Sequence, residues 1–474
     1  MTNIKIYNTL TGKKDLIKPI KGKKINLFVC GPTVYDYSHI GHARTYVIFD
    51  AFVKYLRAQG FDVFYLQNIT DTDDKIIGRA REKGVSPKDL AVAFEKEYLK
   101  DMKDLGVNSV SKYARSTSYI KEIISQIQRL QAKKYAYQID GDGIYFDIGK
   151  FKNYGKLARR TVLQAEDSVS RIDYSKDKKN RGDFCLWKLS SSQPSMVNEF
   201  EPSWSSPFGK GRPGWHIEDT AITEHFFGAQ YDIHGGARDI IFPHHEAEIA
   251  QMEAVSGKSP LVKYWMHTGF LTVNNQKMGK SLGNFITIGD LLKRCPANYL
   301  RFFIVKNLWH SPVDYSESVM IEVKSAIEKI EEFLRKIKNT KSKLKNTKEN
   351  TKLIKGFKES FYKELADDFN TPKAFAVMFE FINKTNILLE KELISKKDAC
   401  DIYKFFEEIN KIFEIINFKK VNKTVPVEIK KLAKLRETHR KNKDWQKADD
   451  VRQQIERRGF MVQDSEAGPI IKSI

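Results

Sequence analysis

One stretch near the N-terminus constrains the fold more than any other, because it predicts a strand, a helix and a second strand in succession. The apolar runs KINLFVC (24–30) and FDVFYLQNI (61–69) have the length of buried strands. The segment between them predicts a turn and an amphipathic helix, with Ser38 as its cap, Arg57 near its end and Gly60 just beyond. Such units build parallel sheets, which bind nucleotides at the carboxyl ends of their strands.

The bulk properties indicate a globular protein. The chain has 474 residues, of which 41% are hydrophobic and 30% charged, and this length suits about two to four domains. The polar N-terminus MTNIKIYNTLTGKK lacks the apolar segment of a signal peptide. The most apolar helical stretch, YVIFDAFVKYL, is too short to span a bilayer and is interrupted by Asp50 and Lys54. We therefore expect a soluble, cytoplasmic protein with no membrane partner.

The cysteine content and the net charge restrict the possible class of protein less than the features above. The four cysteines are widely separated and form no CxxC pair, which suits a reducing compartment. The formal net charge of +21 can reflect a surface that attracts nucleic-acid phosphates. Abundant Lys, Asn and Ile throughout the chain are equally typical of AT-rich coding bias, so charge alone leaves both explanations open.

The remaining pattern predicts an insertion, a return to sheet and then a helical third. A hairpin is expected over 135–148, an irregular polar insertion over 151–213, and sheet-like structure again over 226–236. The lysine-rich segment 335–358 is expected to be a loop or a solvated helix end. Helical spacing of apolar residues marks segments 317–338, 355–389, 395–416, 425–441 and 444–458.

Two short motifs are candidates for nucleotide chemistry. HIGH (39–42) lies where the first strand turns into its helix, and its glycine allows a ligand to approach a helix N-terminus that favours anions. KMGKS (277–281) places two lysines around a glycine, and positioned positive charge stabilises displacement at phosphorus. Each motif alone is weak evidence, because histidines are usually core residues and a lysine-rich chain produces KxxK by chance. Their order along the chain strengthens the interpretation.

A third stretch, FPHHEAEIAQ (242–251), concentrates two histidines and two acidic residues. It is compatible with a metal site, an acid–base pair or an ordinary helix start. The stretch alone does not distinguish these three possibilities, because few of its side chains can face one way.

Taken together, the motifs resemble the cysteinyl-tRNA synthetase family of class I aminoacyl-tRNA synthetases. The resemblance is carried by CGPTVYDYSHIGHAR, NITDTDDKII, DFCLWK, RPGWHIE, HGGARDIIFPHHEAEIAQ and KMGKSLGNF. It continues through DDFNTPKA (367–374) to KDWQKADDVRQQIERRGFMVQD (443–464), so it covers essentially the whole chain. Two departures are small: Gly279 stands where the family usually has serine, and Ala237 where it has a third glycine.

The resemblance implies an α/β fold. A Rossmann-like parallel-sheet catalytic domain is expected over 1–315, with an insertion at about 110–215 and the KMSKS-type loop at 277–281. An α-helical bundle is expected over 316–420 and a small C-terminal anticodon-binding domain over 421–474.

The implied reaction is the ATP-dependent activation of L-cysteine to cysteinyl-adenylate, followed by transfer to the 3′-terminal ribose of tRNA(Cys). Mg²⁺ would accompany ATP, and a monomer is expected. The ATP phosphates would be contacted by His39, Gly41, His42, Lys277 and Lys280. Positioning and electrostatics would supply the rate, with no covalent bond to the enzyme.

The family also carries one zinc ion that binds the thiolate of the substrate. Selection of cysteine over serine then occurs in binding, and no editing domain is needed. The implied ligands are Cys30, Asp219, His244 and Glu248. Spacing of i,i+4 puts the last two on one helix face, and His245 and Glu246 are expected to point away from it.

Asp219 is the main departure, because the family has a second cysteine at this position. An aspartate can ligate zinc through oxygen, which makes the site harder and less thiophilic. The alternative is that Asp219 does not ligate and that metal binds weakly or not at all. Thr70 and Trp215 match positions that shape the cysteine pocket, although simple core packing is the alternative for Trp215.

At the C-terminus the matching anticodon positions are Arg440, Trp445, Asp449 and Asp464. An aromatic ring with polar partners suits unpaired loop bases, which are recognised by stacking and by their exposed edges. For Asp449 a surface helix charge is a fair alternative. Two rival functions are a tRNA-independent cysteine ligase and a catalytically inactive RNA-binding relative.

Overall fold

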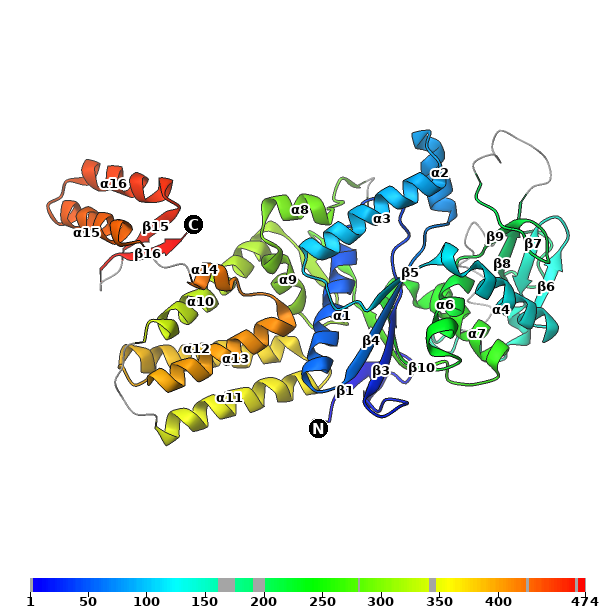
Figure 1. Cartoon of the computed structure of the whole chain (residues 1–474), viewed down its shortest axis with the longest axis horizontal. Helices are drawn as coiled ribbons and strands as arrows, with labels where there is room; N and C mark the ends of the chain where they lie inside the picture. The colour runs from blue at the N-terminus through cyan, green and yellow to red at the C-terminus, as the bar shows by residue number, and fades with distance from the viewer. Residues whose placement is uncertain are drawn as a thin grey trace.

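The computed structural model describes residues 3–160, 175–190, 201–279, 282–340, 347–422, 426–464 and 468–473. In this part of the chain a parallel sheet with the order β11-β10-β3-β4-β5 forms the middle of the molecule (Figure 1). Its strands are β3 (Lys24–Val29), β4 (Asp62–Ile69), β5 (Lys112–Arg115), β10 (Tyr231–Ala237) and β11 (Val262–Thr268). The order reverses between β3 and β10, and α/β proteins bind ligands at the carboxyl ends of strands beside such a reversal.

Helix α1 (Ile40–Ala58) connects β3 to β4 and confirms the predicted strand–helix–strand unit. It lies between the sheet and the helical bundle, so most of its side chains are buried (Figure 1). The predicted cap was wrong. His39 caps α1, because its imidazole accepts a hydrogen bond from the Gly41 N–H, whereas the carbonyl of Ser38 accepts one from Ile288 N at 2.9 Å.

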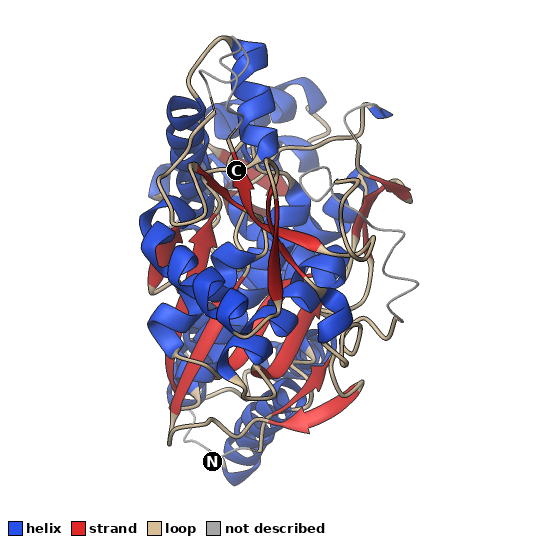
Figure 2. Ribbon diagram, turned by 90° about the vertical axis from the view of Figure 1, so that its right-hand side faces the viewer, coloured by secondary structure: helices blue, strands red, loops and turns tan. Residues whose placement is uncertain are grey.

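The insertion holds more regular structure than the polar sequence predicts. The hairpin of β6 (Ala136–Ile139) and β7 (Gly143–Phe146) is confirmed, and it continues into an antiparallel sheet with β8 (Phe184–Leu189) and β9 (Gly211–Pro213). The expectation of an irregular 151–213 was therefore wrong for these last two strands, which pair through long-range contacts that local polarity does not reveal. Figure 2 views the molecule from the side of this sheet.

The other elements of the region 3–315 surround these sheets. Its helices are α2 (Asp74–Lys83), α3 (Pro87–Asp104), α4 (Ile120–Ala132), α6 (Ile217–Phe227), α7 (Glu246–Ser256), α8 (Ile288–Arg294) and α9 (Ala297–Val305). Its shorter turns are η1 (Ser116–Tyr119), η2 (Ile148–Lys150), η3 (Arg238–Ile240) and η4 (Ile241–His245), which is kinked at Phe242. Its remaining strands are β1 (Lys5–Asn8), β2 (Lys13–Leu16), β12 (Leu271–Val273), β13 (Gln276–Lys277) and β14 (Val313–Tyr315).

The final third is largely helical, as the spacing predicts. The bundle comprises α10 (Glu317–Lys338), α11 (Lys348–Ala366), α12 (Thr371–Glu390), α13 (Lys396–Phe413) and α14 (Phe418–Asn422). The tail comprises α15 (Val427–Lys441), α16 (Trp445–Arg457), β15 (Phe460–Gln463) and β16 (Ile470–Ser473), and it lies beyond the bundle at one end of the molecule (Figure 1). In the described residues, none of the helices is long and apolar enough to cross a membrane.

Two details of this third differ from the prediction. The single helical segment expected over 355–389 is two helices, because Asp368 and Phe369 adopt positive φ and Asn370 caps α12. The antiparallel pair of β15 and β16 was not predicted. The lysine-rich 335–358 provides the end of α10 and the start of α11, and residues 341–346 within it lie outside the described residues.

Candidate functional site

The turn that starts α1 holds two imidazoles in fixed orientations. The backbone N–H of Gly41 donates to Nδ1 of His39 at 3.1 Å, and the backbone N–H of His39 donates to Nδ1 of His42 at 3.2 Å. This arrangement reproduces a capping box with histidines in place of the usual side chains. Because each Nδ1 accepts from a backbone N–H, a neutral ring carries its proton on Nε2 and is a donor there. The rings stack 3.9 Å apart.

The environment keeps His42 neutral. Burial lowers the pKa of His42 well below its usual range, and the neighbouring His39 and Lys75 lower it further. Gly41 leaves room for the rings, because a Cβ added there would lie 2.8 Å from Cε1 of His39 and 3.4 Å from Cε of Met278. The turn therefore presents the Nε2–H of a neutral His42 beside His39 at a helix N-terminus, which suits an anionic ligand.

The lysine-containing segment returns to this turn. His39 forms a β-bridge with Thr287, and Ile40 N donates to the carbonyl of Ile286 at 3.1 Å. Lys277 is exposed on β13, while Lys280 lies outside the described residues. Asn284 closes the loop by accepting from Gly279 N at 2.9 Å and donating to the carbonyl of Lys277 at 3.1 Å. The fold thus brings the two motifs, far apart in sequence, to one place.

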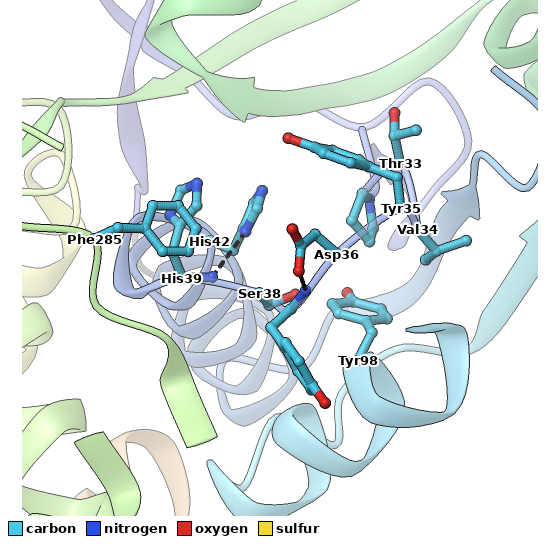
Figure 3. Close-up of a pocket in the computed structure, with 11 residues that line it drawn as sticks. Thr33, Val34, Tyr35, Asp36, Ser38, His39, His42, Tyr98 and Phe285 are labelled. Carbon is cyan, nitrogen blue, oxygen red and sulfur yellow. Dashed lines mark hydrogen bonds between the residues drawn. The ribbon is translucent and has the colours of Figure 1, made fainter. Parts of the chain in front are cut away.

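A hollow borders the same turn. Figure 3 shows His39, His42 and Asp36 around it, with Tyr98 from α3 and Phe285 from the lysine-containing segment. Sequence reasoning did not single out Asp36, Tyr98 or Phe285. Asp36 and Phe285 lie inside CGPTVYDYSHIGHAR and KMGKSLGNF, which marked the segments but not these side chains. No pattern in the sequence indicated Tyr98.

A second cluster gathers all four predicted metal ligands. Cys30 directly follows β3, Asp219 lies on α6, His244 precedes α7 and Glu248 lies on α7. All four are buried. Nε2 of His244 lies 3.0 Å from Oδ2 of Asp219, 3.0 Å from Oε1 of Glu248 and 3.6 Å from Sγ of Cys30. Sγ of Cys30 lies 3.4 Å from Oδ2 of Asp219.

These separations match those of a tetrahedral metal site. Zinc bond lengths place neighbouring donor atoms about 3.4–3.6 Å apart. The separations in the cluster run from 3.0 to 3.6 Å. Nδ1 of His244 lies 2.9 Å from Nδ1 of His216, so the Nε2 of His244 faces the cluster. Burial and the charge of Asp219 raise the pKa of Cys30 to about 12, so a cation is needed to hold this thiol as a thiolate. The donor set fits a divalent metal.

The two remaining polar residues of FPHHEAEIAQ behave differently from each other. Glu246 points away from the cluster, as predicted, and accepts from the backbone N–H groups of Leu157 and Ala158 at 2.9 and 3.0 Å. The prediction for His245 was wrong, because one of its ring nitrogens lies within 4.8 Å of ligand atoms of Cys30 and His244. Both histidines lie in η4, which is kinked at Phe242 (φ −130°, ψ 133°), so this stretch is not the continuous α-helix that the prediction assumed.

Thr70 and Trp215 lie beside this cluster. Oγ1 of Thr70 donates to Oε2 of the buried Glu218 at 3.2 Å. The half-buried indole of Trp215 stacks on His244, with ring centroids 4.3 Å apart and a 22° interplanar angle. Thr70 therefore contacts the neighbour of one proposed ligand, and Trp215 contacts a ligand directly.

Three of the four predicted anticodon residues meet in the tail. The guanidinium of Arg440 lies 5.6 Å from the ring centroid of Trp445 and pairs with Asp464 at 3.2 Å. Asp464 also pairs with Arg436 at 2.6 Å. The side chain of Trp445 is 56% exposed, which is unusual for an indole and leaves a face for stacking. Asp449 is exposed on α16. The hydrogen bond with Asp464 raises the pKa of Arg436, and the charge of Asp449 raises it further.

Comparison with known proteins agrees with this geometry. The family model described as the catalytic domain of class I (C) tRNA synthetases matches residues 16–325, and the DALR domain model matches residues 360–418. A cysteine–tRNA ligase of Thermococcus gammatolerans is 41% identical over 484 residues, covering 99% of each chain. One of Thermoplasma volcanium is 43% identical over 461 residues, covering 97% of each chain.

Solved structures share the fold at low sequence identity. A methionyl-tRNA synthetase of Mycobacterium tuberculosis with methionyl-adenylate superposes with a TM-score of 0.59 at 15% identity, over 82% of this chain and 90% of its own. The LeuRS of Agrobacterium radiobacter, solved in a ternary complex with tRNA, superposes with a TM-score of 0.62 at 10% identity, over 84% of this chain and 85% of its own. With the catalytic-domain match and relatives alike over nearly their full length, the chain belongs to the cysteine–tRNA ligase family of class I tRNA synthetases.

Proposed function

We propose that the protein is an ATP-dependent ligase that joins L-cysteine to tRNA(Cys). The observation that carries the proposal is the position of two sites after one strand. Directly beyond β3, the chain supplies Cys30 to a thiol-compatible donor cluster and then forms the HIGH turn with its imidazole donors. An amino acid held at the first site and a triphosphate at the second would meet at the carboxyl end of the sheet.

In the first step, an oxygen of the cysteine carboxylate attacks the α-phosphorus of ATP, and the bond to pyrophosphate breaks. His39 and His42 donate from Nε2 to phosphate oxygens, while Gly41 keeps the backbone accessible to them. Lys277 and Lys280 neutralise the charge that develops on the leaving group, with Mg²⁺ bound to ATP. In the second step, the terminal ribose hydroxyl of the tRNA attacks the adenylate carbonyl and AMP leaves.

Cys30, Asp219, His244 and Glu248 would hold Zn²⁺. When bound, zinc supplies a Lewis acid that favours a thiolate over an alcohol, and thus cysteine over serine. Trp215 fixes the ring plane of His244 by stacking. Thr70, through its bond to Glu218, shapes the wall of the same pocket.

We assign the C-terminal tail to binding of the tRNA anticodon. Trp445 offers a stacking surface, Arg440 and Asp464 offer polar edges, and Asp449 is a fourth contact on the same helix pair. We propose the catalytic domain over 1–315, the bundle over 316–420 and the anticodon-binding domain over 421–474, in a monomer.

ATP–pyrophosphate exchange tests the enzymatic step, and charging of tRNA(Cys) tests the transfer. The proposal is supported if exchange requires cysteine, does not occur with serine, and is accompanied by charging of tRNA(Cys). Exchange without charging would instead favour a tRNA-independent cysteine ligase. Absence of exchange with intact tRNA binding would favour an inactive RNA-binding relative.

Metal analysis of the purified protein tests the donor cluster separately. We expect one zinc per chain in the wild type and tighter binding in an Asp219→Cys variant, because a thiolate is the softer ligand. A metal-free protein that still rejects serine would contradict the thiolate-based account of selection.

A further inference from the structure

A single buried amide contacts two of the four proposed metal-ligand segments. Asn68, near the end of β4, accepts from the backbone N–H of Gly31 through Oδ1 at 2.5 Å. Its Nδ2 donates to Oδ1 of Asp219 at 2.5 Å and to Oγ1 of Thr70 at 3.3 Å. The orientation of the amide is determined by its neighbours, because Gly31 N–H can only donate and a carboxylate can only accept.

Because of this contact, the two carboxylate oxygens of Asp219 have different partners. Oδ1 is bonded to Asn68, whereas Oδ2 faces Sγ of Cys30 at 3.4 Å and Nε2 of His244 at 3.0 Å. A carboxylate differs from a thiolate in having two donor atoms, and a bidentate carboxylate would occupy a second coordination position. With four protein ligands that each donate one atom, zinc can still accept the thiolate of the substrate as a fifth ligand, and a bidentate Asp219 would take that position.

We propose that Asn68 is a positioning residue that makes Asp219 a one-oxygen metal ligand and so keeps a coordination position open for the thiolate of the substrate. The inference rests on the proposed metal site and concerns how this chain accommodates an oxygen ligand there. Hydrogen-bonded partners of metal ligands commonly change metal affinity about 10- to 100-fold when removed.

Asn68 also supports the backbone beside Cys30, and this second role must be separated from the first. A Cβ added at Gly31 would lie 1.8 Å from the carbonyl oxygen of Asn68, so the two strands pack closely here. An effect of Asn68 that acts through Gly31 is independent of the residue at position 219. An effect that acts through Asp219 disappears when that residue has no second oxygen.

The test is a double-mutant cycle of Asn68→Ala with Asp219→Cys in the full-length protein, with the zinc dissociation constant measured against a chromophoric chelator. We expect Asn68→Ala to raise this constant about 10- to 100-fold in the wild-type background. In the Asp219→Cys background we expect a change below about 3-fold, since the coupled partner is gone. Co²⁺ bound in place of zinc should change its absorption spectrum with Asn68→Ala in the wild-type background, because the geometry of the oxygen ligand changes.

Gln67→Ala is the matched control. Gln67 is a buried amide on the same strand that accepts from the hydroxyl of Tyr98 at 2.9 Å, so its loss should lower stability without changing zinc affinity. If thermal unfolding shows that Asn68→Ala does not fold, Asn68→Ser replaces it in both backgrounds, because serine is polar but too short to reach Asp219.

The outcomes separate the two proposals. A wild type that binds neither zinc nor Co²⁺ overturns the metal site and, with it, this inference. A wild type that binds zinc, with an Asn68 effect that is absent or equal in both backgrounds, overturns the inference alone and leaves the metal site in place.

Discussion

Nη2 of Arg301 lies 2.8 Å from Oδ2 of Asp50, and both side chains are buried although 251 residues separate them. Asp50 lies on α1, the helix that begins with the HIGH turn. The guanidinium also donates to the carbonyls of Phe413 at 2.7 Å and Leu105 at 3.0 Å. Arg301 therefore connects α1 to the helical bundle. Burial alone would raise the pKa of Asp50, but Arg301 and Lys54 hold it below its usual value.

Replacing Asp50 with alanine should destabilise the whole protein. The change leaves the buried guanidinium of Arg301 without its counter-charge, which costs about 3–5 kcal/mol. Urea unfolding measures the loss. The control is Asp367→Ala, which removes a half-exposed pair with Lys14 and should cost less than about 1 kcal/mol. Similar losses for the two variants would show that the buried pair has no special role.

The two functions of His39 should separate in two variants. Asparagine is a good helix cap, so His39→Asn should keep the unfolding free energy within about 0.5 kcal/mol of wild type, whereas His39→Ala should lose about 1 kcal/mol. Both remove the imidazole donor, so kcat for ATP–pyrophosphate exchange should fall about 10²- to 10³-fold in each. A His39→Asn variant that retained wild-type exchange would show that the histidine serves as a cap alone.

These features differ in how far the sequence predicts them. The strand–helix–strand unit and the helices follow from local periodicity, because an element buries the face that its own spacing makes apolar. The place of the HIGH turn between strand and helix was predicted, but its capping was not, because sequence preference favoured Ser38 over the imidazole of His39 as the cap. The assembly of Cys30 with Asp219 came from family resemblance, because the two are 189 positions apart.

Other contacts could not be predicted. The bond between Asn68 and Asp219 spans 151 positions and depends on a substitution that no periodic pattern marks. His245 lies just after a kink at Phe242, which the periodicity of the sequence does not predict. Strand β8 pairs with β7 across a stretch whose polarity resembles that of a loop.

Acid should destabilise the protein by protonating its buried neutral histidines. The contribution of one of them, His267, can be measured separately. Burial lowers the pKa of His267 to about 3, with a further contribution from the charge of Arg238. An unfolded histidine has a pKa of about 6.5, so stability is full above that pH and is lost as the pH falls toward 3. At pH 5 the loss from this group is about 2 kcal/mol.

The measurement is urea unfolding at pH 7.5 and pH 5 for the wild type and His267→Gln. Glutamine keeps a hydrogen-bonding side chain near Thr9 and His245 but does not titrate. The variant should lose about 2 kcal/mol less than the wild type between the two pH values. Equal losses would mean that His267 is protonated without cost in the folded state.

Trp445 should contribute to tRNA recognition and to no other step. Its indole is 56% exposed beside Arg440, and stacking of one base on an aromatic ring is worth about 1–3 kcal/mol. Trp445→Ala should therefore raise KM for tRNA(Cys) roughly 5- to 150-fold in aminoacylation. ATP–pyrophosphate exchange should not change, because it needs no tRNA and the HIGH turn at the start of α1 is separated from the tail by the helical bundle (Figure 1). The control is Leu435→Ala, which removes another exposed apolar side chain of the same tail, 45% exposed on α15. If both variants raise KM for tRNA(Cys) equally, general disturbance of the tail explains the effect. If exchange falls with Trp445→Ala, the indole acts on the catalytic domain. The assignment of this surface to the anticodon would then fail.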